Sequence, residues 1–295
     1  MKIENKNSAL TEKICIITGA NSGIGYETTK LMCAEGVTTI LVCRSQEKAE
    51  KAIERIKQDI PDAKAEFAIA DLSSQKQIGA MARDLLKRYP KIDVLINNAG
   101  SWYSDFDLTE DRFERQWAIN HLSYFLFTHL MLTALQKSDD PRIINVSSDS
   151  HFQGKIHFKD VSLRKNYHGL RAYAQSKLAN VLFTLEFERK KPSGFEHISI
   201  NAVQPGLVKT DIGLKHSISF HGLMWKIRRW LGVSPEKGAA TSVYLAISEE
   251  VKGVSGKYWD KCKPKPPSKK AEDKEDAHKL WQLSLEMCAI RSFFP

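Results

Sequence analysis

Short apolar runs alternate with stretches of helical periodicity along most of the chain. The first run, 14–17, is apolar at every position, which is typical of a strand buried on both faces of a sheet. Strands that alternate with helices indicate parallel pairing with right-handed crossovers. The pattern predicts an α/β fold with a doubly wound, mostly parallel sheet and helices on both faces. The predicted strands are 14–17, 38–43, 65–70, 92–96, 142–148, 198–203 and 256–260, and the predicted helices are 26–35, 47–58, 74–89, 109–136, 170–191, 236–248 and 271–288.

The net positive charge of the chain comes from two segments. The formal net charge is +9 over 295 residues. Residues 252–270 carry +6 and residues 207–235 carry +4, which leaves −1 for the rest of the chain. A nearly neutral body argues against a nucleic-acid groove, which needs basic side chains along a continuous surface. The length fits a single α/β domain with enough chain to bury a full core.

The cysteine and hydropathy patterns predict a cytoplasmic protein. The five cysteines show no C-x-x-C spacing, which argues against a disulfide framework. No window reaches the roughly 18 apolar residues of a spanning helix, and residues 1–13 lack the apolar core of a signal peptide. No metal site is expected either, because His151, His157 and His168 have irregular spacing and no neighbouring cysteines.

A glycine-rich turn connects the first predicted strand to the first predicted helix. It is Thr-Gly-Ala-Asn-Ser-Gly-Ile-Gly, residues 18–25. Glycine permits a sharp turn, and the free N–H groups at the positive end of a helix bind anions such as pyrophosphate. The glycine spacing differs from the G-x-G-x-x-G of the common dinucleotide fingerprint. The turn therefore predicts a phosphate-binding site of a different family.

Three motifs in this order resemble the short-chain dehydrogenase/reductase family. They are the turn 18–25, the sequence Asn-Asn-Ala-Gly at 97–100, and the pair Tyr173 and Lys177. The resemblance covers about residues 13–288 and implies a single Rossmann-type domain over 1–295 that binds a nicotinamide cofactor. The candidate cofactor-binding residues are Thr18, Gly19, Asn21, Ser22, Gly23, Ile24, Gly25, Arg44, Ser45, Asp71, Leu72, Asn98, Ala99, Gly100, Tyr173, Lys177, Pro205, Gly206, Val208 and Thr210.

The residue after the second predicted strand favours NADP(H). A NAD-binding protein places an Asp or Glu there to bind the ribose 2′-hydroxyl, whereas this chain has Arg44 followed by Ser45. A guanidinium binds a 2′-phosphate with paired hydrogen bonds, and a carboxylate repels it. The alternative is that Arg44 is an ordinary surface residue at the end of a strand. Asp71 and Leu72 resemble the family's adenine-contacting pair, although Asp71 equally fits the start of the next helix.

The resemblance implies a catalytic set of Asn120, Ser148, Tyr173 and Lys177. Tyr173 would exchange a proton with the substrate oxygen, and Ser148 would hydrogen-bond the same oxygen. Ser147 is the alternative to Ser148, because strand alternation sends the two side chains to opposite faces. Lys177 would bind the nicotinamide ribose, and Asn120 would hold a water of a proton relay.

The spacing of Tyr173 and Lys177 suggests an electrostatic role for the lysine. Residues four apart lie on one face of a helix. A phenol with a pKa near 10 is a poor base at neutral pH. An ammonium about 5 Å away, at an effective dielectric constant of about 20, would favour the phenolate by roughly 3 kcal/mol, or about two pKa units. We therefore expect Lys177 to lower the pKa of Tyr173.

Residues 207–235 are expected to form a helical substrate lid. An apolar stripe within this segment alternates with basic residues and two tryptophans, which indicates a basic amphipathic helix. Such a helix covers an apolar pocket or lies at a membrane surface, and both interpretations favour a lipophilic substrate. Beyond it, the basic, proline-rich segment 261–270 is expected to be a solvated loop. The terminal helix 271–288 should dock its apolar face on the body.

Longer strings, such as Asn-His-Leu at 120–122 and Gly-Lys-Tyr-Trp-Asp-Lys-Cys at 256–262, resemble the retinol-dehydrogenase-like branch of the family. This resemblance implies an NADP(H)-dependent oxidoreductase acting on a small lipophilic alcohol, aldehyde or ketone, such as a retinoid or lipid carbonyl. Members of that branch often work from an intracellular membrane, but no apolar anchor is expected here, which leaves peripheral contact through the lid as the alternative. Family members often form homodimers through the helices containing Asn120 and Tyr173. A catalytically silent NADPH-binding scaffold and a lipid-surface protein remain alternative functions.

Overall fold

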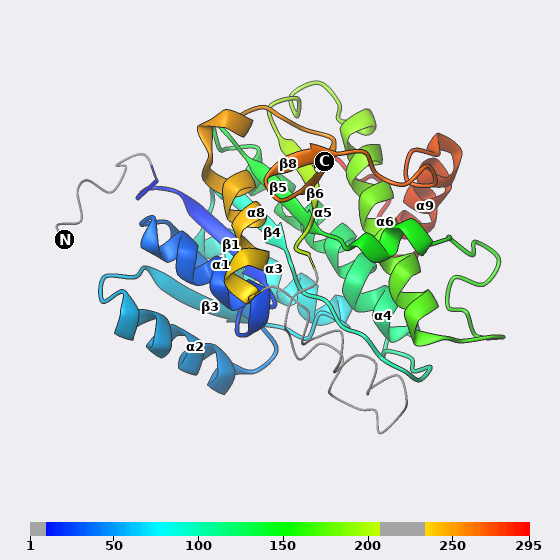
Figure 1. Cartoon of the computed structure of the whole chain (residues 1–295), viewed down its shortest axis with the longest axis horizontal. Coiled ribbons are helices and arrows are strands. Elements are labelled where there is room, and N and C mark those ends of the chain that lie inside the picture. Colours follow the sequence, from blue (N-terminus) through cyan, green and yellow to red (C-terminus); the bar gives the residue numbers. More distant parts are fainter. Residues whose placement is uncertain (1–9, 207–233) are drawn as a thin grey trace.

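The computed structural model describes residues 10–206 and 234–295, and within these ranges eight strands form one sheet (Figure 1). The strand order is β3-β2-β1-β4-β5-β6-β7-β8. Neighbouring strands pair in parallel from β3 to β7, and β8 is antiparallel to β7. The mostly parallel, doubly wound sheet is confirmed. The strands are β1 (Ile14–Thr18), β2 (Thr38–Cys43), β3 (Ala65–Ile69), β4 (Val94–Asn97), β5 (Arg142–Val146), β6 (Ser199–Gln204), β7 (Lys257–Asp260) and β8 (Lys263–Lys265).

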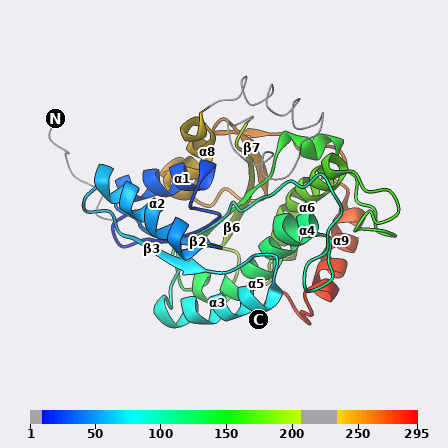
Figure 2. The same ribbon diagram turned by 90° about the horizontal axis from the view of Figure 1, so that it is seen from below.

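Helices cover both faces of the sheet (Figure 2). Alternate residues of β1 enter two separate cores, with Cys15 and Ile17 in one and Ile16 in the other. The terminal helix α9 (Lys274–Met287) packs against α6 (Gly169–Lys190), as its apolar pattern predicts. One face carries α1 (Gly23–Ala34), α2 (Gln46–Asp59) and α8 (Pro235–Ile247), and the other carries α3 (Gln75–Arg88), α5 (Ser123–Leu135), α6 (Gly169–Lys190) and α9 (Lys274–Met287).

The strand order reverses between β1 and β4, and the site lies at the carboxyl ends of these strands. β1 continues to β2 and β3 on one side, whereas β4 continues to β5 and β6 on the other. In open α/β sheets, ligands bind in the crevice outside the carboxyl ends of the strands at such a reversal. The topology therefore brings the residues that follow β1, β2, β4 and β5 together at the carboxyl ends of the strands.

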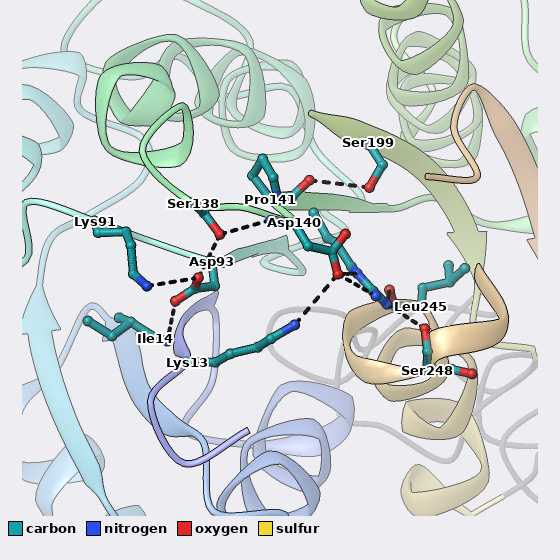
Figure 3. Close-up of polar contacts among 11 residues, drawn as sticks. Lys13, Ile14, Lys91, Asp93, Ser138, Asp140, Pro141, Ser199, Leu245 and Ser248 are labelled. Atoms are coloured by element: carbon teal, nitrogen blue, oxygen red, sulfur yellow. Dashed lines mark hydrogen bonds and ion pairs between the residues drawn. The ribbon is translucent and has the colours of Figure 1, made fainter. Parts of the chain in front are cut away.

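A buried ionic network lies at the opposite end of the sheet, where β4 and β5 begin (Figure 3). The side chain of Arg142 is 2% exposed and donates two hydrogen bonds to Asp140 Oδ2, at 2.9 and 2.6 Å. It also donates to the main-chain oxygens of Leu245 and Ser248 at the end of α8, at 3.2 and 2.8 Å. Nearby, Asp93 accepts a hydrogen bond of 2.9 Å from the first amide of β1. These bonds join β1, β4, β5 and α8 into one framework.

The predicted helix 109–136 begins later than expected and is irregular. Arg112 adopts a left-handed φ of 65°, which interrupts a helix. Glu114 instead caps the helix, because its carboxylate accepts the amides of Gln116 and Trp117 at 2.9 and 2.7 Å. The helix then runs through α4 (Arg115–Trp117), a π-helical turn at Ala118–Leu122 and α5.

The expectation of a loop at 261–270 is wrong for residues 263–265, which form β8 by antiparallel pairing with β7, although most of the segment is exposed as expected. Lys265 is also paired with Asp149 and Asp260, at 3.4 and 3.2 Å. The end of the segment is also anchored, since Lys270 Nζ donates a 2.8 Å hydrogen bond to the main-chain oxygen of Gly154. The prolines leave the antiparallel pairing with β7 intact because β8 is an edge strand.

The chain end beyond α9 returns to the core. Phe293 is 3% exposed, and its ring centroid lies 4.6 Å from those of Phe125 and Trp281. His129 Nδ1 lies 2.6 Å from the main-chain oxygen of Phe293. The apolar pattern of the sequence did not predict this contact. In the described ranges, none of the helices combines the length and apolar composition needed to cross a bilayer.

Candidate active site

The glycine-rich turn is bonded directly to the end of β4. Thr18 Oγ1 accepts the amides of Asn98 and Ala99, both at 2.9 Å. In return, Asn98 Nδ2 donates a 2.8 Å hydrogen bond to the main-chain oxygen of Thr18. Gly19 has a φ of 65°, and a Cβ on Gly25 would lie 2.4 Å from Gly19 O. The junction between the two strands is thus tightly packed, and it consists of Thr18, Gly19, Gly25, Asn98 and Ala99.

The start of α1 presents main-chain amides beside this junction. Ser22 is the N-cap residue, and its side chain makes no capping hydrogen bond. The first amides of a helix have no partner within the helix, and Gly23, Ile24 and Gly25 supply them here. Asn21 lies next to Ser22 in the same turn. This arrangement fits a pyrophosphate, which needs donors at the positive end of a helix dipole.

Arg44 lies at the end of β2 with its side chain 65% exposed. Its Nη1 is 3.9 Å from Asp71 Oδ2, so the two predicted residues are brought together. Asp71 also accepts hydrogen bonds from the amide and hydroxyl of Ser73, at 2.9 and 2.7 Å. Ser45 caps α2. An exposed guanidinium at this edge has room to bind a phosphate group.

Leu72 packs partly against the hydrophobic core. On the other side of the site, Gly206 follows β6 with a φ of 81°, and its amide donates a 3.2 Å hydrogen bond to Gln204 Oε1. Pro205 precedes it in the same turn and is partly exposed. Val208 and Thr210, and the predicted lid up to residue 233, lie outside the described residues.

The two adjacent serines after β5 point in different directions, as strand alternation predicts. Ser147 is buried, and its hydroxyl donates a 2.8 Å hydrogen bond to the main-chain oxygen of Lys177. Ser148 is partly exposed and hydrogen-bonds the side chain of Tyr173. Its hydroxyl also accepts the amide of Ser150 at 3.2 Å. Of the two serines, only Ser148 is brought to the predicted tyrosine.

Tyr173 and Lys177 lie one turn apart on α6, above the end of β5. Lys177 Nζ donates a 2.9 Å hydrogen bond to Val146 O and lies 5.7 Å from the centroid of the Tyr173 ring. The same Nζ is 5.6 Å from the ring centroid of Tyr124. A side chain at Gly100 would come within 3.5 Å of Nζ, so the end of the 97–100 motif adjoins the lysine.

The expectation that Lys177 lowers the pKa of Tyr173 is wrong for this structure. Burial raises the pKa of Tyr173 to about 12, and the hydrogen bond with Ser148 opposes this shift. Burial also lowers the pKa of Lys177 to about 7, because desolvation disfavours its ammonium form. Desolvation, which the Coulomb energy of the pair does not include, acts on both side chains. Near neutral pH, Tyr173 therefore carries its proton.

Asn120 lies in the π-helical turn and faces the same site. Its Nδ2 donates to Ser101 O at 2.9 Å and to Ser176 Oγ at 3.1 Å, and its Oδ1 accepts the amide of Ser101 at 2.8 Å. A Cβ on Gly100 would lie 3.7 Å from this Oδ1. The side chain of Asn120 therefore holds the loop after β4 against α6. The structure thus brings Asn120, Ser148, Tyr173 and Lys177 together.

Tyr124 is a site residue that sequence reasoning missed. Its side chain is buried, its hydroxyl donates a 2.8 Å hydrogen bond to Ala99 O, and its ring faces Lys177 Nζ. Tyr124 comes four residues after Asn120 in a helix, so the same helix face was a usable signal. The Tyr124 side chain therefore lies between the end of β4 and Lys177 and contacts both.

Comparison with known proteins identifies the class to which this fold and site belong. The family described as short chain dehydrogenase matches residues 13–217. Retinol dehydrogenase 13 of Mus musculus is 40% identical over 94% of this chain and 84% of its own length. Retinol dehydrogenase 14 of Mus musculus is 36% identical over 94% of this chain and 86% of its own length. The chain therefore belongs to the short-chain dehydrogenase/reductase family, in its retinol-dehydrogenase-like branch.

Solved structures agree with this fold. An uncharacterized protein from Mycobacterium Paratuberculosis matches with a TM-score of 0.77 and 29% identity, over 96% of this chain and 95% of its own. Salutaridine reductase from Papaver somniferum matches with a TM-score of 0.66 and 22% identity, over 84% of this chain and 100% of its own. The second likeness bears on the fold alone. Family and relatives together define an oxidoreductase that acts on CH–OH groups with a nicotinamide cofactor.

Proposed function

We propose that this protein is an NADP(H)-dependent oxidoreductase that interconverts a small lipophilic alcohol with its aldehyde or ketone, and that a retinoid or other lipid carbonyl is its substrate. The observation that carries the proposal is the contact of Ser148 with Tyr173 beside Lys177, at the edge where the glycine-rich turn and Arg44 lie. A bound nicotinamide cofactor would supply or accept the hydride.

Tyr173 is the proposed proton donor in the reductive direction. Its raised pKa, about 12, keeps the phenol protonated at neutral pH. A carbonyl oxygen that gains negative charge during reduction requires such a donor. In the oxidative direction Tyr173 would take the alcohol proton as the phenolate, by the reverse of the same step.

Ser148 and Lys177 would complete the chemistry. The Ser148 hydroxyl would donate to the same substrate oxygen and stabilise its developing charge, as an oxyanion-hole donor does. Lys177 would hold the nicotinamide ribose with the Nζ protons not used by Val146 O. Asn120 keeps the loop after β4 in place through Ser101, and the main chain of its π-helical turn would hold the relay water.

Arg44 is the proposed determinant of cofactor preference. It is exposed at the end of β2, and its neighbour Asp71 lies 3.9 Å away. A 2′-phosphate would take the place of Asp71 as the partner of the guanidinium, because a dianion attracts it more strongly than one carboxylate. The ribose 2′-hydroxyl of NAD(H) offers no such charge.

The direct test is turnover by the purified full-length protein with retinal and a medium-chain aldehyde, each with NADPH and with NADH. Loss of the absorbance of the reduced nicotinamide, faster with NADPH, is the expected result. Faster turnover with NADH would overturn the role of Arg44 and leave the oxidoreductase intact. Binding of NADPH without turnover of any carbonyl in a broad panel would favour a catalytically silent scaffold.

A further inference from the structure

The turn that follows Ser148 is anchored through a buried histidine. His151 is 0% exposed and lies in the short helix η2 (Asp149–Gln153). Its Nδ1 is 2.8 Å from the main-chain oxygen of Ser148. On the other side of the ring, the amide of Ser268 donates a 3.1 Å hydrogen bond to Nε2. The ring therefore spans from the candidate catalytic serine to the basic, proline-rich segment 261–270.

These contacts fix the protonation state of His151. A main-chain amide can only donate, so Nε2 must accept and Nδ1 must carry the proton that Ser148 O accepts. The ring is neutral in this arrangement, and burial lowers the pKa of His151 below its ordinary value. Protonation would place a second N–H at Nε2, facing the amide of Ser268, and would break that bond. The bridge thus exists in one tautomer only.

Further contacts fasten the same turn to β7 and to segment 261–270. Tyr258 packs its ring 4.6 Å from that of His151 and donates a 3.2 Å hydrogen bond to Asp149 Oδ1. Lys265 pairs with Asp149, and Lys270 donates to the oxygen that follows η2 at Gly154. On the opposite side, a Cβ on Gly154 would lie 2.6 Å from Ala174 O, next to Tyr173. The turn is therefore confined between segment 261–270 and α6.

We propose that His151 is a positioning residue for Ser148, and that segment 261–270 holds the serine at Tyr173 through it. This inference rests on the proposed function and adds a residue that contacts neither the substrate nor the cofactor. His151 is buried, both of its ring nitrogens are engaged, and the oxygen it holds belongs to Ser148 itself. A substrate oxygen held by Ser148 is then placed relative to Tyr173 by the segment that follows β7.

Two substitutions of His151 test its two hydrogen bonds separately. The amide of His151→Asn is placed like Nδ1 and retains the bond to Ser148 O, whereas the amide of His151→Gln is placed like Nε2 and retains the acceptor for Ser268. His151→Ala retains neither. If His151 positions the serine, kcat should fall by roughly tenfold to a hundredfold in the Ala variant, the range for a misplaced catalytic group. The Asn variant, which loses the bond to Ser268, and the Gln variant, which loses the bond to Ser148 O, should each lie between the native protein and the Ala variant.

The readouts separate positioning from general destabilisation. Binding of NADPH, measured by fluorescence, should be unchanged in all three variants, so that the loss falls on kcat. The matched control is His129→Ala on α5, which removes the hydrogen bond to Phe293 O and should leave kcat unchanged. A similar loss of kcat in His151→Ala and His129→Ala, or a parallel loss of NADPH affinity, would overturn the proposal.

The pH profile supplies a second readout. In the native enzyme, kcat should fall at acid pH as His151 gains a proton, and this limb should be absent in His151→Gln. The groups that face the ring are Asp149 on its own element, Tyr258 on β7, and Lys265 on β8, with Lys270 further along. Persistence of the acid limb in His151→Gln would contradict the proposal.

A crystal structure of His151→Ala tests the inference without any turnover. The expected result is a Ser148 hydroxyl displaced from Tyr173, and an unmoved serine would overturn the proposal. If the native protein turns over no carbonyl, the proposed function fails, yet the displacement still decides whether His151 positions Ser148. The two failures are thereby distinguishable.

Discussion

Lys177 Nζ donates a 2.9 Å hydrogen bond to the main-chain oxygen of Val146, the last residue of β5. The lysine is thus tied to the strand end, and its distance to the Tyr173 ring centroid is 5.7 Å. Tyr173 carries its proton near neutrality despite this neighbour. The position of Lys177 suits a role in holding the cofactor.

The pKa of Lys177 predicts an alkaline loss of cofactor capture. Because burial lowers this pKa to about 7, the ammonium loses its proton as the pH rises through that value. The kcat/KM for NADPH, which reports groups of the free enzyme, should therefore decline above a pH of about 7. Arginine stays charged throughout this range, so Lys177→Arg should show a lower rate without the alkaline decline. An alkaline decline that persists unchanged in Lys177→Arg would assign it to another group.

Arg44 predicts the cofactor preference. A hydrogen bond to a charged group contributes about 1.5–3 kcal/mol, so Arg44→Asp should lower kcat/KM for NADPH by roughly tenfold to a hundredfold. Activity with NADH should rise relative to NADPH, because the repulsion of a 2′-phosphate does not apply to NADH. Lys57→Asp on α2 makes the same charge change at another exposed site and serves as the control. An equal response of the two variants would reduce the role of Arg44 to general electrostatics.

Two glycine substitutions test the packing of the cofactor turn. A Cβ on Gly25 would lie 2.4 Å from Gly19 O and 2.5 Å from Asn98 Nδ2. Gly25→Ala should therefore cost about 1–3 kcal/mol of unfolding free energy, the usual range for overpacking, and should weaken NADPH binding. Gly79→Ala, in the middle of α3 with its nearest neighbour at 3.6 Å, should instead stabilise by roughly 0.5–1 kcal/mol. Urea unfolding and a fluorescence titration measure both; an undisturbed Gly25→Ala would mean that the junction is loose.

Breaking the buried pair of Asp140 and Arg142 should lower the stability of the protein without affecting catalysis. Asp140→Asn leaves the guanidinium of Arg142 buried without its charged partner, which typically costs about 3–5 kcal/mol. Asp84→Asn removes a more exposed i,i+4 ion pair with Arg88 and should change stability by less than about 0.5 kcal/mol. Equal losses in the two variants, measured by urea unfolding, would contradict the importance of the buried pair. The KM values of both variants should remain native.

The same pair predicts how stability changes with pH. Burial raises the pKa of Asp140, but the hydrogen bonds and charge of Arg142, with Lys13 and Lys252, outweigh it and leave the pKa lowered. Its contribution is present above the unfolded-state pKa of about 3.9 and is lost as the pH falls through the lower folded-state value. The stability difference between the native protein and Asp140→Asn should therefore shrink on acidification. A difference that stays constant down to denaturation would exclude this linkage.

The strands of the parallel sheet and the helical layers could be predicted from the sequence. Apolar runs and glycine turns involve residues that are close together along the chain. The two serines after β5 likewise divide between two faces as alternation requires. What the sequence did not predict depends on distant contacts or on burial. The strand at Lys263–Lys265 exists through its pairing with β7 and Asp149, and His151 gains its role from Ser268. The pKa of Tyr173 differed from expectation because desolvation is a property of the folded surroundings.

The most direct test of the account is the rate of NADPH-dependent retinal reduction by Tyr173→Phe. The substitution removes only the hydroxyl that hydrogen-bonds Ser148 and carries the proton. Loss of a general acid should lower kcat by about a hundredfold to ten-thousandfold, with NADPH binding and thermal stability close to native. Reduction at an undiminished rate would contradict the assignment of Tyr173 as the proton donor.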